Sequence, residues 1–352
     1  MHLGPKSLNL SRALSWLSAV VISAFLAFNG CSFKPQATGE DNELGILIDA
    51  DLRAEVENTL LEIFCPIVET PQPERRFIPI FGGMESVSRL NTQRFLLLVG
   101  TLEGKGEISA LIAGMLSPEI YSGVQRGEYF VFHKQNEWAR DQHMLILVGS
   151  DAPSLVDQVR AESEFLFNIF DEARTSKIRG ELYRAHEQKD LARQIRERYG
   201  FDLRIPHDYI LVREEPEQGW LRLKRPAPSR WITLWRSPPL PEDPVDSSWV
   251  VQKWSELAAE YADPVQANTD YLSMKPISIS GYSGLELRGL WETVGPQGGG
   301  PFFCRAFYNP TDGRAYLLDG AVFNPGEEKE PYLKQLEVIL GTFRITEFTS
   351  KY

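Results

Sequence analysis

The chain has 352 residues, of which 43% are hydrophobic, and its formal net charge is −11. It is longer than one ordinary domain, and its hydrophobic content is enough for folded cores. The acidic balance excludes proteins that bind nucleic acid through a basic surface, and it offers no attraction to an anionic membrane.

The N-terminus has the pattern of a secretory signal peptide. Lys6 and Arg12 precede a hydrophobic run over residues 13–28. That run is shorter than the roughly 20 apolar residues of a membrane-spanning helix. Gly30 and Cys31 follow closely, and a small residue before a cysteine at this place resembles a bacterial lipobox. The pattern therefore predicts a bacterial lipoprotein precursor.

We expect residues 1–30 to be removed and Cys31 to carry the lipid, which leaves a mature chain with a charge of −13. The alternatives are a signal peptide cleaved elsewhere and an uncleaved anchor. Residues 31–44 are polar without periodicity, which predicts a lipidated flexible tether. Ser32 follows the cysteine where Asp would favour inner-membrane retention. The expected location is therefore the cell envelope, on the outer membrane facing the periplasm.

The first half of the chain alternates strand and helix patterns. Four prolines predict an extended surface segment over residues 66–83. The expected strands are residues 45–50, 94–101, 128–136 and 142–149. One helix is expected to follow Asp51, and two others to cover residues 107–116 and 153–183. A further helix is expected to end at Gly200.

Successive strands dominate after Gly200. They are expected at residues 208–214, 218–224, 230–236, 272–280, 283–291, 302–309, 314–323 and 342–345. Helices are expected at residues 247–261 and 328–341. This change of pattern predicts an α+β protein of two α+β domains. The first, with alternating strands and helices, covers residues 45–185. The second, an antiparallel sheet flanked by helices, covers 186–346, and 347–352 form a tail.

Several short motifs carry a family resemblance. They are Thr70-Pro71-Gln72-Pro73-Glu74, the strand led by Arg94, Trp138-Ala139-Arg140-Asp141-Gln142 and Trp220-Leu221-Arg222. In this order, over essentially the whole mature chain, they resemble a bacterial lipoprotein family known as domain of unknown function 4837. The resemblance implies a lipid-anchored envelope protein and no established activity. Arg75 and Arg76 stand where the family pattern leads us to expect proline or another apolar residue.

Catalytic motifs are missing from the sequence, which lacks HExxH, CxxC and GxSxG. The stretch from Gly100 to Gly106 is one residue short of a phosphate-binding loop. Asp141 and His143 would share one face of a strand, where a carboxylate can orient a general base. No nucleophile motif accompanies them, so we expect hydrogen-bonded structural polar residues. We expect no cofactor and no metal.

Two cysteines remain beside the lipid-bearing one. Cys65 and Cys304 are allowed to form a disulfide in an oxidising periplasm. The alternative is a pair of buried free thiols that act as small hydrophobic residues.

Two successive strands hold three of the chain's eight tryptophans. Alternation places Trp220, Arg222 and Lys224 on one face of the first strand, and Trp231 and Trp235 on one face of the second. Cations interleaved with aromatic rings are suited to stacking on sugars or holding an anionic polymer or peptide. The candidate binding residues are therefore Trp220, Arg222, Trp231 and Trp235. The alternative is a sheet face packed under a helix.

These patterns favour a non-catalytic role over an enzyme. The expected function is that of an envelope lipoprotein that binds an envelope protein or a cell-wall component, is attached to the membrane by lipid and does not bind nucleic acid. The alternative is an envelope hydrolase that acts on glycan or peptide through carboxylates or His143.

Overall fold

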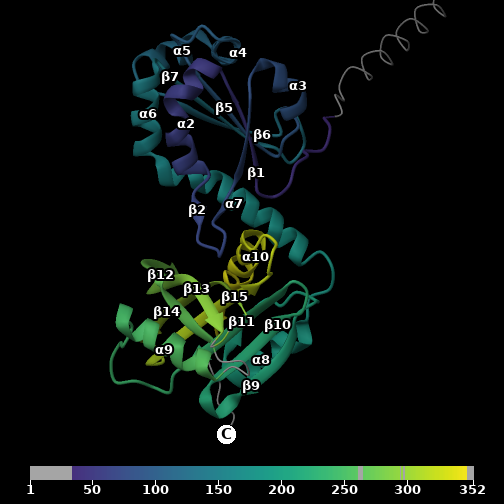
Figure 1. Cartoon of the computed structure of the whole chain (residues 1–352), viewed down its shortest axis with the longest axis vertical. Helices are drawn as coiled ribbons and strands as arrows, with labels where there is room; N and C mark the ends of the chain where they lie inside the picture. The colour runs from purple at the N-terminus through teal and green to yellow at the C-terminus, as the bar shows by residue number, and fades with distance from the viewer. Residues whose placement is uncertain (1–33, 261–264, 294, 296–297, 347–352) are drawn as a thin grey trace, which may run out of the picture.

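The computed structural model describes residues 34–260, 265–293, 295 and 298–346. This part of the chain forms two lobes, each with its own sheet (Figure 1). We call residues 34–182 the N-terminal lobe and residues 183–346 the C-terminal lobe. The expected α+β class is confirmed. No helix in the described ranges is both long and apolar enough to span a bilayer.

The N-terminal lobe contains a five-stranded sheet in the order β4-β1-β5-β7-β6. All neighbours are parallel except β6 and β7. The central strands are nearly continuous apolar runs, which is typical of a sheet buried on both faces. The strands are β1 (Glu43–Ile48), β4 (Ile78–Gly82), β5 (Phe95–Thr101), β6 (Val131–Gln135) and β7 (His143–Gly149).

Helices cover both faces of this sheet. One hydrophobic cluster joins the sheet to α2 (Ala50–Phe64), α6 (Ala152–Ala161) and α7 (Ser163–Leu182). A second cluster joins the opposite face to α3 (Val87–Leu90), α4 (Glu107–Met115) and α5 (Pro118–Gln125).

The C-terminal lobe is built on a seven-stranded antiparallel sheet in the order β12-β13-β14-β15-β11-β10-β9. Helices α8 (Lys189–Tyr199) and α10 (Glu330–Leu340) pack on one face, and α9 (Ser247–Ala259) packs on the other. The strands are β9 (Ile210–Glu215), β10 (Trp220–Arg225), β11 (Ser229–Arg236), β12 (Val265–Ile279), β13 (Tyr282–Thr293), β14 (Gly299–Asn309) and β15 (Arg314–Phe323). A two-stranded sheet pairs β8 (Phe201–Asp202) with β16 (Arg344–Ile345).

The tether prediction is wrong for the part that the structure describes. Residues 34–42 lie against the N-terminal lobe and are not a free segment. The Ala37 amide donates to the carbonyl of Arg140 at 2.8 Å, and the Arg94 amide donates to that of Thr38 at 2.9 Å. These backbone bonds dock the segment beside the sheet. The predicted signal peptide and Cys31 lie outside the described residues.

The proline-rich segment is also more regular than the sequence suggested. It contains a small hairpin, β2 (Ile67–Val68) and β3 (Glu74–Arg75), followed by β4. Pro79 is aligned with Leu44 of β1. Because β4 is an edge strand, a residue without an amide hydrogen is tolerated there. The predicted helix over 153–183 is divided into α6 and α7, with Glu162 between them.

Charged side chains join the lobes. Arg76 follows β3 and is 9% exposed. Its guanidinium pairs with Asp171 of α7 at 3.0 Å, and with Glu330 and Glu337 of α10 at 3.0 and 2.5 Å. Arg174 of α7 is fully buried and donates to both oxygens of Glu330, at 2.8 and 2.7 Å.

The same set of charges continues into the antiparallel sheet. Arg288 donates to Glu337 and to Glu286, both at 2.7 Å. Lys334 of α10 donates to Asp171 at 2.7 Å. We call this set the interlobe network. Its members are Arg76, Asp171, Arg174, Lys275, Glu286, Arg288, Arg305, Glu330, Lys334 and Glu337.

Replacing Arg76 with Met should destabilise the protein strongly, because three largely buried carboxylates lose a shared partner. Breaking a buried ion pair on one side costs about 3–5 kcal/mol. Urea unfolding of a soluble chain that starts near Lys34 measures this loss. The matched control is Arg53→Met, which breaks a half-exposed pair with Glu57 and should cost less than about 1 kcal/mol. Similar losses in both variants would contradict the structural role of Arg76.

The network should also make stability sensitive to acid. Burial alone would raise the pKa of Glu286, but Arg288 and Arg305 outweigh it and lower that pKa to about 2. Burial also acts to raise the pKa of Asp171, but Arg76 and Lys334 outweigh it and lower that pKa. A carboxylate whose pKa is lower in the folded state gives its full stabilisation when the pH is above its unfolded-state pKa. This stabilisation is lost as the pH falls through the folded-state pKa.

The free energy of unfolding should therefore fall as pH drops from the ordinary glutamate value of 4.5 towards 2. Urea titrations at several pH values between about 5 and about 3 measure the slope. Glu286→Gln removes one of the titrating groups and should flatten that slope. An unchanged slope in this variant would be the contrary result.

Candidate functional site

A cavity of about 520 Å³ opens on the α9 face of the antiparallel sheet. This volume lies within the range of small-molecule sites. We call it the tryptophan cavity. Its lining comes from six strands, α9 and the β13–β14 turn: Val212, Arg213, Trp220, Arg222, Lys224, Ser229, Trp231, Trp254, Val265, Trp291, Thr293, Gly298, Asp319, Ala321 and Phe323.

Strand register brings the predicted residues to one side of the sheet. Trp220 is aligned with Trp235, and Lys224 with Trp231, across β10 and β11. The guanidinium of Arg222 lies 5.3 Å from the Trp231 ring centroid, and the Lys224 ammonium also lies 5.3 Å from it. The interleaving of cations and aromatic rings expected from the sequence is therefore present, and much of it faces a cavity.

An irregularity in the edge strand enlarges the cationic side. The register between β9 and β10 shifts at Arg222/Leu223, which leaves Val212 as an extra residue in β9. Val212 and its neighbour Arg213 both line the cavity, although regular alternation would send them to opposite faces. Beta-bulges commonly redirect side chains in this way beside functional sites. The Arg213 guanidinium lies 4.9 Å from the Trp220 ring centroid.

Aromatic rings form a corner of the cavity. Trp231 meets Trp291 edge to face, with centroids 6.1 Å apart, and Trp291 lies 5.8 Å from Phe323. Ala321 is aligned with Trp231 on the neighbouring strand and contributes only a methyl group. A small residue between large rings leaves room for a ligand there.

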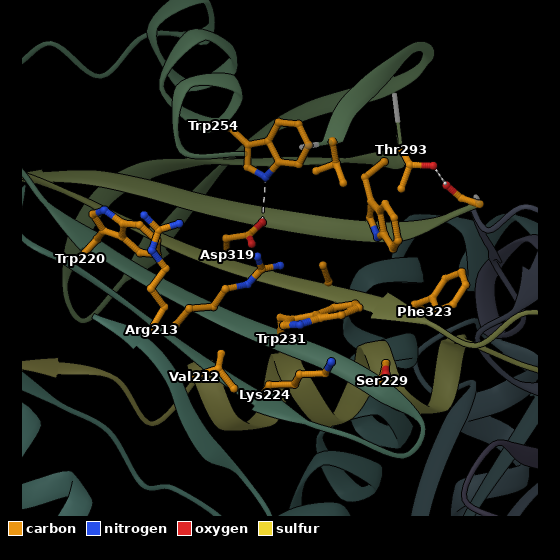
Figure 2. A pocket seen from close by; sticks show the side chains of 15 residues that line it. Val212, Arg213, Trp220, Lys224, Ser229, Trp231, Trp254, Thr293, Asp319 and Phe323 are labelled. Carbon is orange, nitrogen blue, oxygen red and sulfur yellow. Dashed lines mark hydrogen bonds between the residues drawn. The ribbon is translucent and has the colours of Figure 1, made fainter. Parts of the chain in front are cut away.

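Helix α9 closes one side of the cavity. Figure 2 shows Trp254 reaching from this helix towards Asp319, with Trp231 and Lys224 on the strands below. The Trp254 indole donates to Asp319 at 2.8 Å and stacks on Phe302 with centroids 4.1 Å apart. Asp319 is 1% exposed. This contact fixes the position of the ring at the cavity wall.

The charges of the lining favour an anion. Arg213, Arg222 and Lys224 contribute three positive charges, whereas Asp319 is the one carboxylate among the described lining residues. The chain as a whole carries a net charge of −11. Positive charge is therefore concentrated at this cavity against the overall balance of the protein.

The four predicted binding residues do not form one exposed surface. Trp231 and Arg222 are half-buried and line the cavity, and Trp220 lines it with only 1% of its surface exposed. Trp235 lies outside the lining, packs against Trp249 at 6.1 Å and is 7% exposed. Trp235 faces α9, so for this residue the alternative of a sheet face packed under a helix is correct.

Sequence reasoning missed Trp254, Trp291 and Asp319. Trp254 and Trp291 belong to elements that the sequence predicted correctly, yet their meeting with β10 and β11 depends on the order of strands in the sheet. A buried acidic residue in an apolar strand, as Asp319 is in β15, was the signal available in the sequence.

The disulfide that the sequence allowed is not formed. Cys65 and Cys304 are free and buried. Cys65 belongs to the core between the parallel sheet and α2, α6 and α7, whereas Cys304 belongs to the core under α9. Burial raises the pKa of the Cys65 thiol to about 12 and raises that of Cys304 as well. The two thiols therefore act as small apolar residues in separate cores.

The pairing of Asp141 with His143 is not made either. Asp141 accepts from the Gln36 amide at 2.6 Å, and within the described ranges Nδ1 of His143 has no hydrogen-bond partner. Burial lowers the pKa of His143, and His133, whose ring lies 5.6 Å away, lowers it further. Asp141 therefore does not make the hydrogen bond to Nδ1 by which a carboxylate orients a general base.

The carboxyl edge of the parallel sheet is another place where ligands often bind. Here Asp49 at the end of β1 accepts from the amides of Ile108 and Ser109 at 2.9 Å each. An internal carboxylate thus occupies the N-terminus of α4, where a phosphate would otherwise be attracted. In the part of the chain that the structure describes, no group of three or more His, Cys, Asp or Glu residues is arranged to hold a metal ion.

Similarity to solved structures is weak. A crystal structure from Bacteroides thetaiotaomicron VPI-5482 aligns with 44% of this chain at 13% identity and a TM-score of 0.25, and the chain spans about half (47%) of its length. LpqN of Mycobacterium tuberculosis, described as involved in cell envelope biogenesis, aligns with 42% of this chain and 83% of its own at 17% identity and a TM-score of 0.28.

The Ran-binding protein Mog1p of Saccharomyces cerevisiae aligns with 42% of this chain and 90% of its own, at 11% identity and a TM-score of 0.28. No curated protein matches the chain. The sequence model of the family described as "Domain of unknown function (DUF4837)" matches residues 187–342. Of the motifs that suggested this family, Trp220-Leu221-Arg222 lies inside the match and the others precede it. The predicted resemblance to domain of unknown function 4837 is therefore confirmed, and the match covers the C-terminal lobe, which contains the tryptophan cavity, rather than the whole mature chain.

Proposed function

We propose that this chain is a lipid-anchored binding protein of the bacterial cell envelope and that the tryptophan cavity holds its ligand. The ligand class is a small anion with a ring or an apolar body, such as an acidic component of the cell wall. The observation that carries the proposal is the combination of three cations with the rings of Trp231 and Trp291 in one cavity. Cations neutralise the charge of such a ligand, while indole rings stack on its body.

The location rests on the N-terminal sequence. A signal peptide that ends at Gly30 and a lipid on Cys31 would attach the protein to a membrane, and Ser32 favours the outer membrane over the inner one. Several acyl chains give stable attachment, because each buried methylene contributes about 0.8 kcal/mol. The folded lobes would then face the periplasm and have access to cell-wall components.

Binding is favoured over hydrolysis by the contents of the cavity. Acid-pair hydrolysis of a glycan requires two carboxylates across the substrate. Asp319 is the one carboxylate among the described lining residues, and it already accepts a hydrogen bond from Trp254. His143 lies in β7 of the other lobe and does not line this cavity.

Lipid attachment predicts a specific N-terminus. Mass spectrometry of the protein purified from membranes should find Cys31 as the first residue, carrying acyl chains. Cys31→Ser should release or misprocess the protein without preventing the lobes from folding, because the described fold begins after this residue. An unmodified N-terminus at another residue would contradict the anchor.

The cavity predicts binding of an anionic aromatic molecule. The dye 8-anilinonaphthalene-1-sulfonate, a ring system with one sulfonate, should bind the folded soluble chain with saturable fluorescence. Trp231→Ala should weaken binding about thirtyfold, the effect of losing a central aromatic contact. Trp249→Ala is the matched control, because Trp249 belongs to α9, packs against Trp235 and lies outside the lining. It should leave binding nearly unchanged.

A charge variant separates electrostatic attraction from apolar contact. Lys224→Gln should weaken the sulfonate dye about tenfold but leave the neutral analogue N-phenyl-1-naphthylamine unaffected. Melting temperatures of all variants identify any that have lost structure. Equal losses for both dyes, or no loss in Trp231→Ala, would show that the cavity does not bind in the way proposed.

A further inference from the structure

A second cavity lies between the lobes and shares no lining residue with the tryptophan cavity. It has a volume of about 390 Å³, and we call it the interlobe cleft. The N-terminal lobe contributes Arg76 and Asp171 together with Phe167 and Asn168 of α7. The C-terminal lobe contributes the larger part, from β12, β13, β14, α10 and the segment that follows α10.

Strand register places one carboxylate among several cations here. Glu286 of β13 is aligned with Lys275 on β12 and with Arg305 on β14. Its oxygens lie 2.7 Å from Nε of Arg305, 2.7 Å from Nε of Arg288 and 3.4 Å from Nζ of Lys275. A single buried carboxylate is therefore shared by three cations.

These cations keep hydrogen-bond donors that no described group uses. The Arg305 guanidinium donates through Nε to Glu286, while its two Nη groups have no acceptor in the described ranges. The Lys275 side chain is 63% exposed, and among the described residues its ammonium pairs with Glu286 alone. Arg344 donates through Nη1 to the carbonyls of Gly341 and Phe343. Guanidinium and ammonium donors in this arrangement match the oxygens of a phosphate or carboxylate.

The charge balance of the cleft points the same way. Five cations and three carboxylates are among its described lining residues. The carboxylates of Asp171, Glu286 and Glu337 are each already paired with two or three cations. Positive charge in a partly buried site is costly unless an anion or solvent compensates it.

We propose that the interlobe cleft binds a small oxyanion, a phosphate or carboxylate group, through Arg305, Lys275 and Arg344. The bound group would accept from the Nη groups of Arg305 and the ammonium of Lys275, and Glu286 would keep its present partners. This site does not depend on the tryptophan cavity or on the function proposed for it.

The position of the cleft gives this anion a structural consequence. Arg288 connects Glu286 to Glu337, and Glu337 pairs with Arg76 of the N-terminal lobe. An anion beside Arg305 therefore sits at one end of a chain of ion pairs that crosses between the lobes. Ligand binding to the folded state alone stabilises that state, so an oxyanion should raise the unfolding temperature.

The test uses inorganic phosphate and acetate with the soluble two-lobe chain. Phosphate should raise the melting temperature more than sodium chloride does at the same ionic strength, and calorimetric titration should show saturable binding. A larger effect of acetate than of phosphate would identify a carboxylate as the preferred group. Arg305→Gln should weaken phosphate binding about tenfold or more, because a charge-assisted contact is lost.

Three other variants make the result interpretable. Lys275→Gln alters an exposed side chain, should leave the melting temperature without phosphate nearly unchanged, and should still reduce the phosphate response. Arg193→Gln removes an exposed cation of α8 outside the cleft and should respond as the unaltered protein does, as should Lys224→Gln in the tryptophan cavity. A response equal to that of chloride, or one that persists in both Arg305→Gln and Lys275→Gln, would overturn the proposal.

Discussion

The arrangement of the two lobes depends on the guanidinium of Arg76. This group leaves water almost completely and is compensated by three carboxylates from α7 and α10. The desolvation cost of such charges is met only when their geometry is good and their hydrogen bonds are complete. Arg174 is compensated by two contacts to Glu330 and one to the carbonyl of Arg76, while its buried Nε has no hydrogen-bond partner among the described residues. Packing between the lobes is therefore directional, because an ionic contact constrains distance and angle more narrowly than an apolar one.

A second constraint arises from the two faces of the antiparallel sheet. Helices α8 and α10 lie over one face, while α9 lies over part of the other. The tryptophan cavity occurs at the part of this second face formed by β9, β10, β11 and the ends of β13 and β15. Large rings beside Ala321 maintain a hollow there, because rings that are held by one another and by Asp319 cannot collapse into it. The cavity is thus a product of packing as much as of composition.

Most helices and strands could be predicted from sequence, because hydrophobic periodicity is local. The strand at Arg314–Phe323 and the end of α8 before Gly200, whose φ is 71°, are clear examples. The cation–tryptophan rows followed from alternation alone. In the sequence, Arg76 stands out only as a departure from a family pattern, because its partners lie 95 to 261 residues away in the chain. Contacts between residues so far apart in the chain depend on how helices and strands pack after they have formed. A local sequence pattern does not predict such contacts.

Alternation along the strands also separates the two cavities. On β14, Phe303, Arg305 and Phe307 face α10, whereas Phe302, Cys304 and Ala306 face α9. On β13, Arg288 reaches the interlobe cleft and Trp291 reaches the tryptophan cavity. Two cationic sites can therefore share strands without sharing side chains. In an acidic protein this arrangement concentrates positive charge at two partly buried places, where screening by salt is weaker than at the open surface. An anion that enters either cavity interacts mainly with the cations that line it, and much less with the acidic surface outside.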